Sequence, residues 1–422
     1  MSFDETSLYK IKTELPGVRR SLFDLAIWKN GLAFRKINFS ENGVPIIKIA
    51  ELNNGIGSNT SFTKGNYDNS VRLCHDDLLF SWSGNPQTSI DIYRYQLNDG
   101  WLNQHIFKVT ANEELVSKDF LFYLLKYLKS HFIQIASNKQ TTGLGHVTIA
   151  DLKRMSVVIP NKDIQNKVVA FIKPIDDQIQ VNNEINKNLA VQIQSLCNAW
   201  LTDFIPFNGE CPSDWQLTPL SSFANFVSGY SYKGNELQPS EVAMATIKNF
   251  DRNGGFKLDG FKEIVPSNKL KPEHHAQLFD TLVAHTDLTQ KAEVIGNAEP
   301  VLSFSGYQDL IFSMDVVKVT PTDPLISKFL IAAMLKTRQF KEHCLAYVNG
   351  TTVLHLSKKA LADYSLMLPR NFSILKPLDD AVSAMYRQMS SNIDENSKLS
   401  KLRDSLLPRL MSGEIDVSNI NI

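Results

Sequence analysis

An internal duplication constrains this chain more than any other feature of its sequence. The segment Asn182-x-Glu184-x-Asn186-x-x-Leu189 recurs as Asn392-x-Asp394-x-Asn396-x-x-Leu399, at an offset of 210 residues. Three further blocks recur in the same order at offsets that grow from 198 to 209; they match Leu22, Ala26, Gly31 and Phe34 with Leu220, Ala224, Gly229 and Tyr232, Asp77–Phe80 with Asp280–Val283, and Thr142, His146, Leu152 and Pro160 with Thr351, His355, Leu361 and Pro369. One chain therefore contains two similar modules, whose loops have changed in length while the scaffold was kept.

Each module ends in a segment with the heptad spacing of a coiled coil. The first has spacings of alternately three and four residues; its positions are Ile172, Ile175, Ile179, Asn182, Asn186, Leu189, Ile193, Leu196 and Trp200. The second repeats this spacing; its positions are Val382, Met385, Met389, Asn392, Asn396, Leu399, Arg403, Leu406 and Leu410. Such spacing over four heptads predicts two long helices that pair with each other. Pro174 and Pro377 indicate either helix starts or kinks.

The matched asparagines predict how the two helices pair. Asparagine in an apolar seam is unfavourable unless its amide finds a partner, and it then fixes the register of the helices. In an antiparallel pair, Asn182 and Asn186 face Asn392 and Asn396. The alternative is two separate amphipathic helices, each packed on its own domain with solvated asparagines. The matched polar positions favour the pair.

Composition places the chain among ordinary globular proteins. Its 422 residues are enough for two or three domains, and 43% hydrophobic with 21% charged residues is a typical content. No apolar run has the length of a membrane span, and the first residues lack the pattern of a secretory signal. The four scattered cysteines predict reduced thiols, so we expect a cytoplasmic protein. The 44 basic residues equal the 44 acidic ones, which weighs against a simple nucleic-acid binder without excluding one.

The irregular segments between the helices carry the side chains that suit DNA recognition. Asn and Gln amides pair with adenine edges, Arg and Lys with guanine, and small polar groups with phosphate oxygens. Any single segment is more consistent with an ordinary solvated loop, and only the set favours recognition. The candidate DNA-binding residues are Lys48, Asn53, Ser81, Trp82, Ser83, Asn85, Gln87, Thr141, Thr142 and His146 in the first module, and Lys248, Asn249, Arg252, His285, Thr286, Thr289, Gln290, Lys291, Thr351, Thr352 and His355 in the second.

The sequence offers no pattern typical of a catalytic centre. It has no phosphate-binding G-x-x-x-x-G-K-[ST] loop, and Gly143-Leu144-Gly145 is too short for a dinucleotide fingerprint. It also has no Asp/Asn-Pro-Pro-aromatic element of an amino-methylating site. The doublet His274-His275 lacks the spacing of a zinc site. We therefore expect neither a catalytic residue nor a metal or cofactor site in this chain.

The whole chain resembles the specificity subunits of type I restriction–modification systems. The resemblance is strongest in the tail from Leu399 to Ile415, which contains Leu406-Leu407-Pro408-Arg409-Leu410, and in the Pro212-Ser213-Asp214-Trp215 opening of the second module. In the first module, only Leu15-Pro16-Gly17-Val18 is similar to that opening. Each module also ends at a proline, Pro160 or Pro369, before its long helix.

The resemblance implies an α+β fold with an approximate internal two-fold repeat. It implies target recognition domains at residues 1–160 and 206–369, and spacer helices at residues 161–205 and 370–422 that pair as an antiparallel coiled coil. Each domain would recognise one half of a split site in double-stranded DNA. The spacer would bind two modification subunits, and restriction subunits would join them. S-adenosylmethionine, ATP and Mg²⁺ are expected on those partners.

Rival interpretations differ in what the modules bind. One is a specificity subunit of a related modification system with a different nuclease architecture. Another is a scaffold whose repeated domains bind polypeptide rather than DNA. A hydrolase with an unfamiliar site would need clustered carboxylates or a nucleophile beside a base, and the sequence shows neither.

Overall fold

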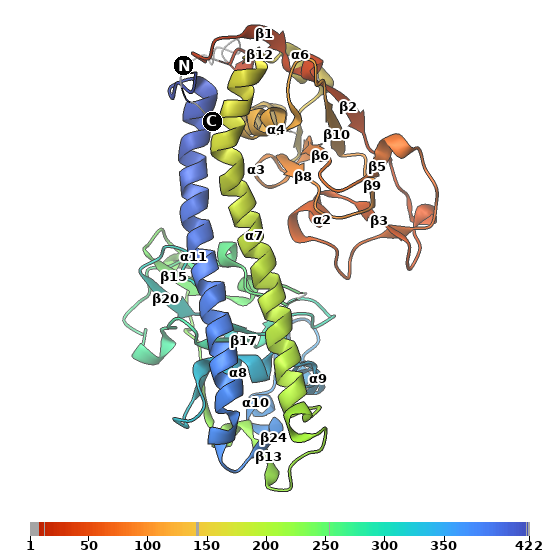
Figure 1. The fold of residues 1–422 in the computed structure, drawn as a ribbon. Helices are drawn as coiled ribbons and strands as arrows, with labels where there is room; N and C mark the ends of the chain where they lie inside the picture. Colours follow the sequence, from red (N-terminus) through yellow and green to blue (C-terminus); the bar gives the residue numbers. More distant parts are fainter. Residues whose placement is uncertain (1–7, 12, 141–142, 253, 419, 421–422) are drawn as a thin grey trace. The chain divides into compact units, whose positions relative to one another are not determined.

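The computed structural model divides the chain into two compact units. It describes residues 8–11, 13–140, 143–252, 254–418 and 420. Unit 1 comprises residues 1–177 and 399–422, and unit 2 comprises residues 178–398. Both boundaries fall inside long helices, so each unit contains one segment of each helix (Figure 1). Helices and strands are mixed in both units, which confirms the predicted α+β class.

Unit 1 contains two four-stranded sheets, with strand orders β2-β10-β6-β8 and β4-β3-β9-β5, and the pairs β1-β12 and β7-β11. The strands are β1 (Val18–Ser21), β2 (Ala26–Asn30), β3 (Val44–Ile47), β4 (Phe62–Thr63), β5 (Arg72–Leu73), β6 (Leu78–Ser81), β7 (Ser83–Gly84), β8 (Asp91–Arg94), β9 (Gly100–Leu102), β10 (Ile106–Ala111), β11 (Gly145–His146) and β12 (Ser156–Ile159). The helices are α2 (Ile49–Asn54), α3 (Pro86–Ser89), α4 (Lys118–Tyr127), α5 (Lys129–Asn138), α6 (Ile149–Arg154) and the start of α7 (Lys162–Leu201).

Unit 2 repeats this plan. The sheet β14-β21-β17-β19 corresponds to β2-β10-β6-β8 of unit 1, and the pair β13-β24 corresponds to β1-β12. The strands are β13 (Trp215–Pro219), β14 (Ala224–Ser228), β15 (Val242–Ala245), β16 (Lys262–Glu263), β17 (Thr281–Ala284), β18 (Thr286–Asp287), β19 (Ala298–Pro300), β20 (Asp309–Phe312), β21 (Val316–Pro321), β22 (Val348–Asn349), β23 (Leu354–Leu356) and β24 (Ser365–Pro369). The helices are the remainder of α7, α8 (Lys328–Leu335), α9 (Arg338–Ala346), α10 (Lys359–Asp363) and most of α11 (Lys376–Ser412).

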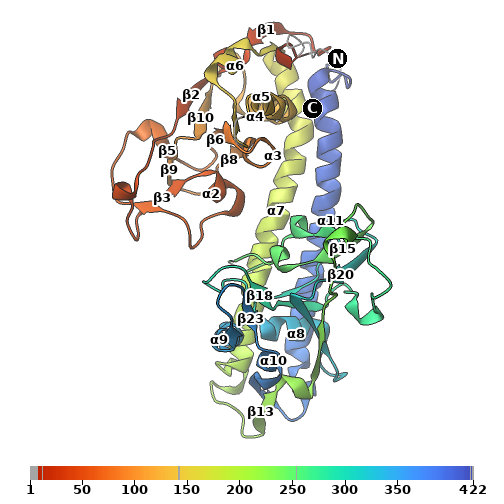
Figure 2. The same cartoon turned by 180° about the vertical axis from the view of Figure 1, so that it is seen from behind.

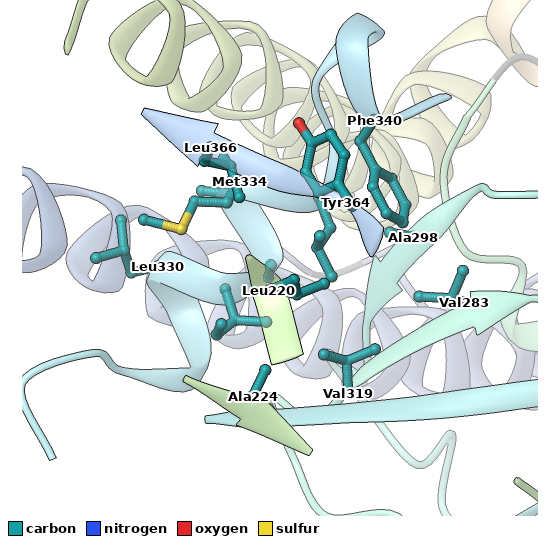
Figure 3. Close-up of a cluster of buried hydrophobic side chains, with 14 of the residues drawn as sticks. Leu220, Ala224, Val283, Ala298, Val319, Leu330, Met334, Phe340, Tyr364 and Leu366 are labelled. Carbon is teal, nitrogen blue, oxygen red and sulfur yellow. The ribbon is translucent and has the colours of Figure 1, made fainter. Parts of the chain in front are cut away.

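Apolar packing between helix and sheet forms the core of each unit. In unit 2, Leu330 and Met334 of α8 lie among Leu220, Val283 and Val319 from the strands and turns beneath them (Figure 3). In unit 1, Phe120 and Leu124 of α4 occupy the comparable position, and Leu407 and Leu410 of α11 join that core. Burial of side chains of this size is the main stabilising contribution to such a fold.

In each unit, a pair of short helices follows the central strands. The segment Ser117–Phe132 forms α4 and α5, which are separated at Leu128, and Leu325–Leu345 forms α8 and α9. The break between α8 and α9 has a local cause: the Thr337 side chain accepts a hydrogen bond from the Phe340 backbone amide and thereby starts a new helix.

The long helices begin earlier than the prolines suggest. Helix α7 starts at Lys162, so Pro174 lies inside it, and α11 starts at Lys376, where Pro377 is tolerated in the first turn. In unit 1, Arg403 Nη1 of α11 donates to Asp176 Oδ1 of α7 over 3.0 Å. Within unit 2 the helices lie side by side (Figures 1 and 2), and Asn182 contacts Asn396 while Asn186 contacts Asn392. From Asn182 to Asn186 the residue numbers rise along α7, whereas the residues that they contact fall from Asn396 to Asn392 along α11. The two helices are therefore antiparallel.

Two matched glycines fix a turn in each unit. A Cβ atom on Gly31 would lie 2.1 Å from the backbone oxygen of Asn103, and a Cβ atom on Gly229 would lie 2.2 Å from that of Ser313. Backbone atoms give way less easily than side-chain ends, so only glycine fits at these positions. The duplication of Gly31 and Gly229 thus follows from a close approach of two backbone segments.

We expect Gly31→Ala and Gly229→Ala to destabilise the protein by about 1–3 kcal/mol each, because the added methyl group displaces the facing strand end. Thermal unfolding of the full chain measures the effect. Gly234→Ala is the matched control, since a Cβ atom there meets nothing within 4 Å. Equal unfolding midpoints for all three variants would contradict the role of the close approach.

Candidate functional site

The same three-segment surface is present in both units, and residues 82 and 285 lie at its centre. In unit 1 the Trp82 amide donates to the His105 carbonyl (3.3 Å), and the Trp82 carbonyl accepts from the Val147 amide (2.8 Å). In unit 2 the His285 amide donates to the Asp315 carbonyl (2.8 Å), and the His285 carbonyl accepts from Leu356 (2.8 Å). We call these the unit 1 surface, formed by residues 81–87, 103–105 and 143–147, and the unit 2 surface, formed by residues 285–291, 313–315 and 349–356.

The unit 1 surface brings several predicted residues together. Ser83 pairs with His146 across strands β7 and β11. The Trp82 ring stacks on Phe107 with centroids 5.5 Å apart, and its Nε1 donates to Asn30 Oδ1 over 3.0 Å. Asn85 caps α3, because its side chain accepts from the Gln87 amide. Trp82 is thus held firmly, while Asn85 and Gln87 are exposed beside it.

The unit 2 surface brings a second set together. Thr286 pairs with His355 across β18 and β23, and His355 also pairs with Asn349. Gln290 Nε2 donates to the Thr351 carbonyl over 2.7 Å, which ties the loop after β18 to the loop before β23. Thr289 donates to Asp287 Oδ1 through both its amide and its hydroxyl. Lys291 and Thr352 are exposed on the same two loops.

Electrostatics set the protonation of the central histidine. Burial lowers the pKa of His285, and electrostatic interactions with the nearby His355 and Lys358 side chains lower this pKa further. The His285 imidazole is therefore neutral at pH 7, and it offers one donor and one acceptor nitrogen rather than a positive charge. This chemistry suits a hydrogen-bonding contact better than a phosphate contact.

Other predicted residues lie apart from these surfaces or are already engaged. Lys48 precedes α2 and donates to Ser61 Oγ, and Asn53 accepts from Tyr93. Lys248 is exposed in the turn at residues 247–249, and Arg252 Nε lies 3.4 Å from Glu293 Oε2. Thr141 and Thr142 fall outside the described residues.

Burial corrects three of the predicted contact residues. Ser81 and Asn249 have no exposed surface, and Thr286 is 4% exposed. Ser81 Oγ accepts from the Asp91 amide, while Asn249 accepts from the Thr246 amide and donates to the Lys257 carbonyl. The Ser81 and Asn249 side chains thereby support the surrounding loops, whereas the buried Thr286 hydroxyl has no hydrogen-bond partner among the described residues.

Sequence reasoning missed the turns at residues 103–105 and 313–315. The Gly31 amide donates to the Ile106 carbonyl and the Gly229 amide to the Val316 carbonyl, so the two turns are structurally equivalent. The sequence does contain a signal for these turns. Each turn separates two apolar strands, and the two turns are related by the offset of the duplication. Gln104 and His105 in unit 1, and Met314 in unit 2, therefore belong to the candidate surfaces.

A buried carboxylate anchors the loop that contributes to the unit 1 surface. Asp151 of α6 is 1% exposed and accepts from Lys139 Nζ (2.5 Å), the Thr148 amide (2.7 Å) and Tyr9 (2.9 Å). Burial alone would raise the pKa of Asp151, but the hydrogen bonds from Lys139 and Thr148 outweigh it and lower the pKa below the ordinary 3.8. Lys139 begins the loop that leads to His146, so this ion pair fixes one end of the loop.

We expect Asp151→Asn to destabilise the protein by about 1–3 kcal/mol, because the partly exposed Lys139 and Thr148 donors lose a buried charged acceptor and solvent screens the lysine only in part. A carboxyl group whose pKa is lower in the folded state than in the unfolded state stabilises the fold at pH values above its unfolded-state pKa. This contribution disappears as the pH falls through its folded-state pKa. The difference in unfolding midpoint between variant and wild type should therefore be full at pH 7 and shrink below about pH 4. A constant difference from pH 7 to pH 3 would contradict it.

The fold and its two surfaces define a duplicated α+β protein with a pair of long helices. The family of the "Type I restriction modification DNA specificity domain" matches residues 18–190. The HindI type I restriction enzyme specificity subunit of Haemophilus influenzae is 24% identical over 76% of this chain and 84% of its own length. The MjaIX specificity subunit of Methanocaldococcus jannaschii is 21% identical over 75% of this chain and 73% of its own.

A solved structure supports the fold independently. The S subunit of a type I restriction–modification system from M. genitalium matches 96% of this chain and 98% of its own, with a TM-score of 0.51 and 16% identity. These findings confirm the resemblance noted in the sequence: the chain is similar to type I restriction enzyme specificity subunits, and residues 18–190 match the DNA specificity domain of that family. Among the described residues, no helix has the length and apolar character needed to cross a membrane.

Proposed function

We propose that this chain is a non-catalytic DNA-recognition subunit that binds a bipartite site. In this proposal, residues 1–160 and 206–369 are target recognition domains, and residues 161–205 and 370–422 form an antiparallel coiled-coil spacer. Each domain contacts one half-site through its own surface. The observation that carries the proposal is the repeated backbone frame around residues 82 and 285, because one frame with two different sets of side chains suits two different targets.

The side chains on the two surfaces support different half-sites. Trp82, Gln104 and His146 lie on the unit 1 surface, whereas His285 and Met314 take the places of Trp82 and Gln104 on the unit 2 surface. Sequence in a duplex is recognised by hydrogen bonds and apolar contacts to base edges. Two surfaces that differ at equivalent positions are therefore expected to select different bases.

The proposal extends to partner subunits. Unit 2 has a cleft of about 690 Å³ between α7, the loop at residues 254–258 and the start of α9. Lys187 and Arg338 lie at this cleft, as does Val191, which is 64% exposed. A cleft that is lined by an exposed apolar side chain and by basic groups suits a polypeptide with apolar and acidic residues. We assign this cleft to a modification subunit, with two such subunits and the restriction subunits completing the complex in the cytoplasm. S-adenosylmethionine, ATP and Mg²⁺ would be bound by those partners.

Salt dependence of binding tests the proposal. Each phosphate contact releases counterions, so the affinity of the full chain with its modification subunits for duplex DNA should fall about a thousandfold or more between 50 and 200 mM salt if six or more phosphates are contacted. A polypeptide-binding scaffold, the rival function, would bind duplex DNA weakly and without sequence preference at any salt concentration. Mapping of adenine methylation in a host that carries the complex should then show one bipartite motif.

A further inference from the structure

Equivalent backbone contacts place Gln104 and Met314 at the same position in the two units. The Leu32 amide donates to the carbonyl of Leu102, and the Tyr230 amide donates to that of Phe312. The next residues, 103 and 313, lie against the matched glycines, and the contacts of Trp82 and His285 then fix residues 105 and 315. The residue between these fixed points is Gln104 in unit 1 and Met314 in unit 2.

The two side chains differ in chemistry although their position is the same. Gln104 is half-buried, and its Nε2 lies 3.2 Å from His105 Nε2. Met314 is 56% exposed, and it directly precedes Asp315, whose carbonyl accepts from the His285 amide. A glutamine amide can pair with both N6 and N7 of adenine, whereas an apolar side chain makes contact with the C5-methyl group of thymine. The unbranched methionine side chain adapts well to such an edge.

The backbone around this position is held rigidly, which a base contact requires. Each turn is fixed by hydrogen bonds on both sides and by the close approach of a glycine. Side chains on a rigid frame discriminate between ligands better than side chains on a loose loop, because misplacement by about 1 Å is enough to lose the contact. The position is therefore suited to determine specificity in each unit.

We propose that residues 104 and 314 are specificity-determining residues: Gln104 selects adenine at one position of its half-site, and Met314 selects thymine at one position of the other. This inference rests on the proposed function, since it assigns a base preference to surfaces that we take to bind DNA. The inference also distinguishes the two half-sites, because a substitution of Gln104 or of Met314 should alter the preferred bases of only one half-site.

Selection from a pool of random duplexes tests the inference. The full chain, purified with its modification subunits, is used as wild type, as Met314→Gln and as Gln104→Met, and the bound duplexes are sequenced. Met314→Gln should replace thymine by adenine at one position of one half-site, with a change in preference of about tenfold, and leave the other half-site unaltered. Gln104→Met should make the reverse change in the other half-site.

Controls distinguish the possible failures. Leu217 of β13 is 66% exposed but lies outside the unit 2 surface, so Leu217→Ala should select the wild-type sequence. Met314→Ala, which removes the apolar contact without adding a polar one, should weaken the thymine preference alone. If wild type selects a bipartite sequence and both residue 314 variants select the same one, the inference is overturned. If wild type itself selects no sequence, the proposed function fails instead.

Discussion

Replacement of Asn182, Asn186, Asn392 and Asn396 by leucine is expected to leave α7 and α11 paired but without a unique register. In unit 2, Asn182 Nδ2 donates to Asn396 Oδ1 over 2.9 Å, and Asn392 Nδ2 donates to Asn186 Oδ1 over 2.8 Å. Asn182 and Asn392 are 3% exposed, so their amides depend on these contacts. A slipped pairing would leave the buried amides of Asn182 and Asn392 without partners, and that penalty is what excludes other registers.

Leucine removes this penalty. Replacement of buried polar pairs by apolar residues is often neutral or stabilising, so we expect unfolding to occur at the same or a higher temperature. A slip by one heptad moves one helix along the other by about 10 Å, which corresponds to about three base pairs. A complex assembled with the four-leucine variant should therefore methylate sites with more than one half-site spacing, whereas the wild-type complex methylates sites with a single spacing.

A single substitution has the opposite effect on stability. Asn182→Ala leaves Gln178 Nε2 and Asn396 Oδ1 without their partner and should destabilise the protein by about 1–3 kcal/mol. Asn188→Leu is the matched control, because Asn188 is exposed on the same helix outside the seam. Normal assembly and an unaltered, single spacing in the four-leucine variant would refute the register role of the asparagines.

The sequence predicts the repetitive parts of this fold well. The heptad spacing predicts the long helices, and the matched asparagines predict their contacts, because both depend on side chains at regular intervals. The start of α7 was less predictable, since Pro174 suggests a helix start or a kink, whereas the helix begins at Lys162 and continues through Pro174. A proline one-third of the way into a long helix is tolerated when neighbouring packing compensates for the missing hydrogen bond.

The candidate surfaces were predictable only in part. Trp82, His146, His285 and His355 stand out as side chains in polar loops, and the structure places each of them on a surface. Gln104 and Met314 do not stand out, because the backbone hydrogen bonds that bring their turns to the surface leave no side-chain pattern. Burial of Ser81 and Asn249 was hidden for the same reason: each hydroxyl or amide satisfies backbone groups that no local pattern reveals.

The chain divided between Glu210 and Cys211 is expected to reassemble, and its first half alone is expected to form a homodimer. Asn182 and Asn392 are equivalent in the duplication, as are Asn186 and Asn396. The contact between Asn182 of α7 and Asn396 of α11 is therefore equivalent to the contact between Asn392 of α11 and Asn186 of α7. The two contacts differ only in which helix supplies which residue. Such reciprocal contacts are those of an isologous interface, so a second copy of α7 can take the place of α11.

The ion pair between Asp176 and Arg403 should bias this assembly toward two different halves. Ile193 is the counterpart of Arg403 in the duplication, so a homodimer of residues 1–210 would place isoleucine near Asp176 and leave that carboxylate unpaired. The pair is partly exposed, so the bias is about 0.2–1 kcal/mol.

Asp176→Leu should strengthen the homodimer, whereas Asn186→Lys should abolish it by placing a charge in the seam. Sedimentation of residues 1–210 measures both effects, and a monomer at every concentration would contradict the exchange of helices. Because the homodimer carries two identical surfaces, its preferred DNA should be a palindrome of one half-site.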